Sequence, residues 1–189
     1  MIQGYRMRKV LYLFGLVTDA DIEWMARTGA QRWIDPGEVL IREGVPVSAL
    51  ILVLEGELAV SVRGAGEVAR LEVGDVVGEM SFVDSAPPSA TVAALTRTRI
   101  LALDKAALTR KLEGDVGFGY RFYRALAIFL ADRLRGTNRR MSVGEAGGLA
   151  GEAPLTDELD VNVLDNISHA GEGFHQLLRL LNAKTAAPG

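Results

Sequence analysis

A carboxylate and several hydroxyl groups gather in residues 78–92, which read GEMSFVDSAPPSATV between two strand-like runs. Backbone N–H groups that converge at a short turn can bind an anion, because their dipoles add toward it. The stretch is therefore a candidate anion-binding turn. A purely structural interpretation is equally open, in which Glu79 caps the turn and Ser81, Ser89 and Thr91 are ordinary turn hydroxyls.

The stretch resembles the phosphate-binding cassette of cyclic nucleotide-binding domains, which usually reads G-E-(L/M)-A-L, a short loop and P-R-(A/S/T)-A-T-V. The upstream order P-G-E-V-L-I-R-E-G followed by L-V-L-E-G-E-L-A-V also follows this family, so the resemblance extends over residues 10–140. It implies a catabolite-activator-like β-roll that binds a cyclic nucleotide, cAMP or cGMP, and transmits binding through a C-terminal helix.

The resemblance also implies roles for individual residues. The N–H groups near Ser81, Ser89 and Ala90 would hold the phosphate. Glu79 would accept a charge-assisted hydrogen bond from the ribose 2′-OH. The implied ligand-binding set comprises Gly78, Glu79, Met80, Ser81, Ser89, Ala90 and Thr91.

One residue departs from the family pattern. Pro88 stands where the family carries the arginine that pairs with the cyclic phosphate, and proline offers neither a charge nor an N–H. Losing a desolvated ion pair typically costs about 2–5 kcal/mol, so we expect weak binding of ordinary cyclic nucleotides. The nearest arginines along the chain, Arg70 and Arg97, are candidates to reach in from neighbouring strands.

The elements that would position this cassette follow from the spacing of apolar residues and glycine turns. Short β-like segments with glycine-containing turns between them predict a mainly β fold, an antiparallel β-roll or jelly roll over residues 31–104. Thr18 and Asp21 form a capping-box pattern that predicts a helix near residues 19–28. A short helix follows the roll, and a long helix is expected at about residues 118–140.

The last part of the chain differs in composition from the rest. We expect a cyclic nucleotide-binding-like domain over residues 1–141, a flexible glycine-rich linker over 142–154 and an acidic tail over 155–189. The tail contains a short amphipathic helix whose apolar face carries Phe174, Leu177, Leu178 and Leu181. About 30 residues cannot bury an adequate core alone, so this face packs on the roll or a partner subunit, or stays disordered.

The long helix carries an apolar stripe that suggests an interface. A single domain of this size would leave much of the stripe exposed, and a large exposed apolar patch usually marks an interface. We therefore expect a homodimer. The contributing residues are Phe118, Phe122, Ala125, Leu126 and Phe129.

Composition excludes or disfavours several functions. The 189-residue chain has no cysteine, so it cannot form disulfides or thiolate metal sites. Its net charge of −3 is not suited to binding nucleic acid. The two histidines, His169 and His175, lack the spacing of a metal site, so neither a metal nor a required cofactor is expected. Apolar runs are too short to span a membrane, no signal peptide is recognisable, and we expect a cytoplasmic protein.

Three functions remain open. The leading one is a non-catalytic cyclic nucleotide sensor, with ligand in the cassette and the long helix as its output, acting on an effector protein. The second is a ligand-free interaction or dimerisation scaffold, as Pro88 suggests. The third is a receptor for another phosphate-bearing ligand, such as cyclic di-GMP. No nucleophile elbow, acid–base pair or Walker loop is present, so an enzyme is not expected, and the acidic tail disfavours DNA binding.

Overall fold

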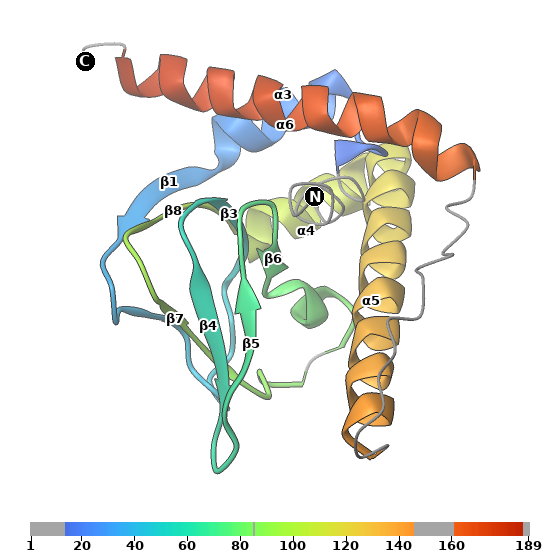
Figure 1. Ribbon diagram of the computed structural model, residues 1–189. Coiled ribbons are helices and arrows are strands. Elements are labelled where there is room, and N and C mark those ends of the chain that lie inside the picture. The colour runs from blue at the N-terminus through green and yellow to red at the C-terminus, as the bar shows by residue number, and fades with distance from the viewer. Residues whose placement is uncertain (1–13, 85, 146–160, 187–189) are drawn as a thin grey trace.

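The computed structural model describes residues 14–84, 86–145 and 161–186, and it consists of two antiparallel sheets with helices packed against one of them (Figure 1). The elements in chain order are α3 (Asp19–Thr28), β1 (Ala30–Ile34), β2 (Val39–Ile41), β3 (Ala49–Glu55), β4 (Leu58–Val62), β5 (Gly66–Leu71), β6 (Val76–Val77), the 3₁₀ helix η1 (Glu79–Phe82), β7 (Thr91–Ala94), β8 (Thr98–Asp104), α4 (Lys105–Gly114), α5 (Val116–Glu145) and α6 (Val161–Ala186).

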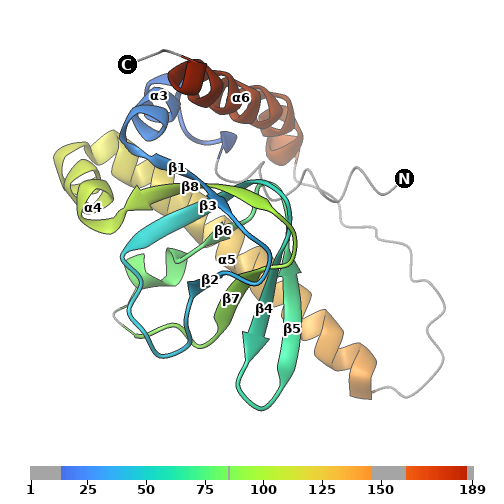
Figure 2. The same cartoon turned by 90° about the vertical axis from the view of Figure 1, so that its left-hand side faces the viewer.

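The two sheets face each other and enclose the first of two apolar cores (Figure 2). One sheet has the strand order β1-β8-β3-β6 and the other has the order β2-β7-β4-β5. Residues that alternate along the strands point inward, among them Ile51, Val60 and Ile100. The antiparallel β-roll and the flanking helices expected from the sequence are confirmed, and the short strand β6 is an addition to that prediction.

The sheet that contains β3 is covered on both faces, which explains the composition of that strand. Ile51 and Val53 point into the roll, whereas Leu50, Leu52 and Leu54 pack against the helices on the outer face. A strand covered on both sides reads as a continuous apolar run instead of an alternating one. The apolar sequence of β3 therefore places the helical layer against this sheet and leaves the other sheet exposed on its outer face.

The helix α3 begins with the capping box that the sequence predicts. The Thr18 hydroxyl accepts a hydrogen bond from the Asp21 N–H, and the Asp21 carboxylate accepts one from the Thr18 N–H. The same carboxylate receives two hydrogen bonds from Arg121 on α5, at 2.9 and 3.1 Å. Asp21 thus starts α3 and attaches it to the long helix.

The helix α5 begins at a carboxylate that connects it to α4. Asp115 accepts a hydrogen bond from the Phe118 N–H at 2.9 Å, and its other oxygen accepts one from the Lys111 ammonium at 2.7 Å. The hydrogen bond from Lys111, followed by the one from the Phe118 backbone, lowers the pKa of Asp115 below its ordinary value. The start of the long helix is therefore tied to an ionised carboxylate.

We expect the Asp115 carboxyl to titrate at lower pH than an aspartate in an unfolded peptide. Because the folded-state pKa is lowered, its contribution to stability is present above the unfolded pKa and is lost as the pH falls through the folded pKa. A carbon-detected NMR titration of the side-chain carboxyl checks this. Lys111→Met, which removes the leading cause, should move the Asp115 midpoint upward, and an unchanged midpoint would contradict the assignment.

The C-terminal helix α6 lies along α3, at the end of the molecule opposite the β4–β5 hairpin (Figure 1). Its buried face carries Phe174, Leu177 and Leu181, and Phe174 stacks edge-on against Phe14 at 5.6 Å between ring centroids. The Lys184 ammonium donates to the Arg27 carbonyl at 3.1 Å. The expected apolar face therefore packs on the helical layer of its own chain.

The boundaries near the end of the chain differ from those expected. The helix in the tail is 26 residues long, and α5 continues to Glu145, four residues into the segment expected to be a linker. The remaining linker residues, 146–154, lie outside the described residues. In the portion of the chain that is described, no helix combines the length and the apolarity needed to cross a membrane.

Candidate functional site

The cassette turn begins with a backbone conformation that only glycine adopts easily. Gly78 has φ +85°, and a Cβ there would lie 2.5 Å from the Ala49 carbonyl oxygen. This turn directs the chain into η1, where the Ser81 hydroxyl donates to the Gly78 carbonyl at 2.7 Å. The Ser81 hydroxyl thus stabilises the turn itself, which agrees with the interpretation of Ser81 as an ordinary turn hydroxyl.

The opposite side of the cassette is fixed by two hydrogen bonds to the turn that follows β2. The Pro88 carbonyl accepts from the Gly44 N–H at 2.8 Å. The Thr91 hydroxyl accepts from the Glu43 N–H at 3.1 Å, so it is engaged with the neighbouring chain segment. Both contacts anchor the loop without using a side chain of the cavity wall.

These two sides enclose a cavity of about 660 Å³, within the range of small-molecule sites. Its wall is largely aliphatic and includes Ile41, Val47, Val60, Val62, Val68, Val77 and Val92. Of the seven residues predicted to bind ligand, six line the cavity: Gly78, Glu79, Met80, Ser81, Ser89 and Ala90. Thr91 is placed outside it, facing a separate hollow beside Arg42 and Arg63.

The charges around this cavity are acidic. Among the described residues that line it, the ionisable side chains are Glu79 and Asp84, and none is a lysine, arginine or histidine. The two arginines suggested as replacements point elsewhere. Arg70 pairs with Glu67 at 2.7 Å, and Arg97 lies over the Trp33 ring at 4.6 Å. Neither supplies the missing cation.

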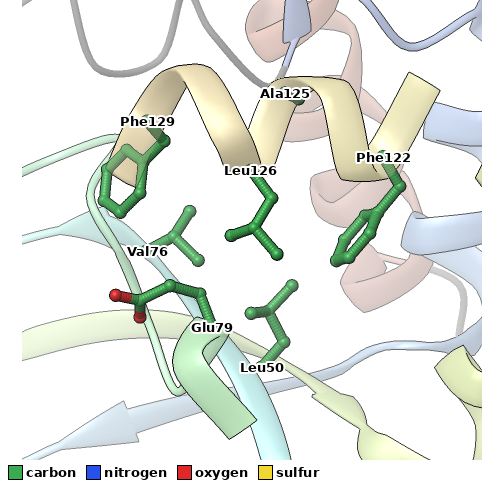
Figure 3. Close-up of a pocket in the computed structure, with 7 residues that line it drawn as sticks. All are labelled: Leu50, Val76, Glu79, Phe122, Ala125, Leu126 and Phe129. Atoms are coloured by element: carbon green, nitrogen blue, oxygen red, sulfur yellow. The ribbon is translucent and has the colours of Figure 1, made fainter. Parts of the chain in front are cut away.

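Glu79 connects the cavity with the long helix. Its side chain is 2% exposed and rises from η1 toward α5, with the carboxylate on the side of Val76 and Phe129 (Figure 3). Within the described part of the chain, it is the one residue that lines both the large cavity and a narrow apolar pocket under α5. The remaining walls of that pocket are Leu50, Val76, Phe122, Ala125, Leu126 and Phe129.

Comparison with known proteins agrees with this architecture. The family model of the cyclic nucleotide-binding domain matches residues 31–115, from β1 to the residue before α5. Residues 31–115 form a cyclic nucleotide-binding domain of this family. A crystal structure of such a domain from Methylobacillus flagellatus is 25% identical, with a TM-score of 0.64 over 77% of this chain and 86% of that one.

Two curated relatives show the same domain within longer proteins. A Rhodopseudomonas palustris protein assigned as a potassium channel is 36% identical over 98 residues, 51% of this chain and 24% of that protein. The cAMP-dependent protein kinase regulatory subunit of Yarrowia lipolytica is 38% identical over 80 residues, 42% of this chain and 21% of that subunit. This chain therefore spans about a quarter or less of the length of these relatives.

Two further residues of this cyclic nucleotide-binding domain connect the cassette to the helices. Neither of them was assigned to the site from the sequence. The Lys105 ammonium, at the start of α4, donates to the Ser81 carbonyl at 2.6 Å and lies 5.5 Å from the Phe82 ring centroid. Phe82 stacks edge-on against Phe122 of α5, at 5.9 Å between centroids. The sequence could have indicated Phe82, because it lies within the cassette motif. For Lys105, the only indication in the sequence is its position directly after β8.

The apolar stripe of α5 was expected to be exposed, but most of it is buried. Phe118, Phe122, Ala125 and Leu126 are at most 7% exposed, because they pack into the helical core of their own chain. The premise that a single domain would leave these residues free is therefore wrong. The homodimer stays a prediction. Among the α5 side chains that the structure describes, the large apolar ones that are exposed are Val116, Tyr120, Tyr123 and Leu134.

Proposed function

We propose that this domain is a non-catalytic sensor in which a ligand of the nucleotide class occupies the cavity of about 660 Å³ and α5 transmits the change. The observation that carries the proposal is the position of Glu79, which lines both the cavity and the pocket under α5. A ligand hydroxyl that donates a hydrogen bond to the Glu79 carboxylate changes the interactions of Glu79 in the pocket under α5. The regulatory relatives support the same general role.

The contacts of η1 supply a second connection. Displacement of η1 by ligand acts on Phe82 and on the Lys105–Ser81 bond, and through them on α5 and α4. Packed aromatic pairs have preferred geometries, so a shift of one ring requires the other to move. The cassette and the long helix are thus expected to move together.

Substituting Glu79 with glutamine is expected to weaken ligand binding at least about tenfold, because a charge-assisted hydrogen bond contributes about 1.5–3 kcal/mol. Calorimetric titration with adenosine, guanosine, cAMP, cGMP and cyclic di-GMP measures the change. The matched control is Glu113→Gln, the same substitution at an exposed position of α4. If the tightest ligand binds both variants equally, Glu79 is not its partner.

The movement of α5 can be followed by distance measurements, because the chain contains no cysteine. Ala127→Cys on the exposed side of α5 and Val73→Cys on the turn before β6 place spin labels on the helix and the roll. A ligand that binds is expected to shift the distance distribution between the labels. If none of the five compounds binds or shifts it, the interaction-scaffold function takes the place of the sensor.

A further inference from the structure

The outer face of the sheet β2-β7-β4-β5 (Figure 2) carries a second hollow, apart from the cassette cavity. Val60 and Val92 belong to the core inside the roll, so their neighbours Ser61 and Thr91 point to the opposite face. Ser61 and Thr91 are direct partners in the ladder between β4 and β7, which places their hydroxyl groups close together. The hollow that they line measures about 410 Å³, within the range of small-molecule sites.

Two arginines complete the polar lining of this hollow. Arg42 follows β2 directly, and Arg63 begins the turn between β4 and β5. A guanidinium group is always charged and presents a planar fork of N–H donors that matches the oxygen atoms of a phosphate. The hollow therefore combines two positive charges with two hydroxyl groups on one face of the sheet.

Within the part of the chain that the structure describes, Arg42 and Arg63 form no ion pair, unlike most other arginines of the roll. The paired arginines are Arg32 with Glu38, Arg70 with Glu67, and Arg99 with Glu55. The two guanidinium groups without a carboxylate partner line the same hollow, so their charge is available to an anionic ligand.

The one carboxylate in the described lining, Glu43, holds the walls of the hollow together. Its Oε2 accepts the Arg63 N–H at 2.9 Å, and the Glu43 N–H donates to the Thr91 hydroxyl at 3.1 Å. These bonds connect the turn after β2 with the β4–β5 hairpin and with β7. Because the Thr91 oxygen is the acceptor in this contact, its own O–H can still donate to a ligand.

We propose that this hollow binds the phosphate group of a small phosphate monoester. Arg42 and Arg63 donate to its oxygen atoms, and the Ser61 and Thr91 hydroxyls donate to those that remain. A monoester carries a charge of about −1.5 to −2 at pH 7, and the lining, with two guanidinium groups and one carboxylate, has an excess of positive charge. The inference concerns a second site, which shares only Val62 with the described lining of the cassette cavity, and it does not rest on the proposed sensor function.

Calorimetric titration of the intact chain with ribose 5-phosphate and with ribose tests the site. Ribose 5-phosphate is expected to bind, with an affinity that falls as salt is added, whereas ribose lacks the anion and should not bind. Arg42→Gln and Arg63→Gln should each weaken binding at least about tenfold, the factor for losing one charge-assisted hydrogen bond. The matched control is Arg110→Gln, which removes the same charge from an exposed position of α4 outside the hollow and should bind like wild type.

NMR spectra of the arginine Nε–Hε groups locate the binding. Ribose 5-phosphate should shift the signals of Arg42 and Arg63 and leave the signal of Arg70, whose Nε donates to Glu67, unchanged. Each signal is assigned from its absence in the corresponding glutamine variant. Ser61→Ala, which removes a neutral donor only, should weaken binding by about two- to tenfold.

Several outcomes would overturn the inference. Equal affinities of wild type, Arg42→Gln and Arg63→Gln would exclude the hollow as the site. Binding of inorganic phosphate without binding of ribose 5-phosphate would indicate an adventitious ion only. A phosphoserine peptide that binds more tightly than ribose 5-phosphate would contradict the small-molecule assignment. If no phosphate compound binds, the inference is wrong and the sensor function is untouched, because that function is tested in the cassette cavity by Glu79→Gln.

Discussion

Replacing Asp21 with alanine is expected to lower the free energy of unfolding by about 3 kcal/mol, the lower part of the range for breaking a buried ion pair. The Asp21 side chain is 3% exposed, and that of Arg121 is 27% exposed. The substitution leaves the guanidinium without its partner and removes the capping bond to the Thr18 N–H. Both losses fall on the junction between α3 and α5.

Urea denaturation followed by far-ultraviolet circular dichroism measures the effect. The matched control is Asp19→Ala, which removes an exposed carboxylate from the same first turn of α3 and should change stability by less than about 0.5 kcal/mol. Equal stabilities of the two variants would show that the Asp21–Arg121 pair does not connect the helices in solution. A double variant that also carries Arg121→Met should recover part of the loss, because no unpaired guanidinium remains.

Leu177→Ala is expected to cost about 2–5 kcal/mol of stability, the range for removing a buried leucine side chain and leaving a cavity. Leu177 is 0% exposed and belongs to the same apolar core as Phe14, Ile22 and Phe118. The contact places α6 in the apolar core that it shares with α3, β3 and α5. The helix α6 is therefore expected to unfold together with the roll, in a single transition.

An exposed position two residues beyond Leu177 on α6 provides the comparison. Arg179 is exposed, and Arg179→Ala should leave the unfolding midpoint nearly unchanged. Hydrogen exchange monitored by mass spectrometry adds a local measurement, with protection of α6 backbone amides expected in wild type and reduced in Leu177→Ala. A wild-type α6 whose amides exchange freely would show that this packing does not hold in solution.

Local sequence patterns determined the roll and its cassette. Glycines at the turns, such as Gly78 with φ +85°, take conformations that other residues adopt only with strain. The Thr18–Asp21 capping box forms between residues three positions apart, so the sequence predicts it. The strand β3 is buried on both faces, and its continuous apolar run is visible in the sequence for that reason. The strand β6, Val76–Val77, was missed because two residues carry no periodic pattern.

Tertiary structure decided where each apolar face and each charge is placed. The stripe on α5 has the same periodicity whether it meets a partner or its own core, and only the fold shows Phe118 and Phe122 buried within the chain. Thr91 lies within the cassette motif, yet its hydroxyl faces Glu43 because side chains alternate along β7. Arg70 and Arg97 are close to the cassette in sequence but engage Glu67 and Trp33. Periodicity fixes which residues share a face, whereas the packing of distant segments determines what that face meets.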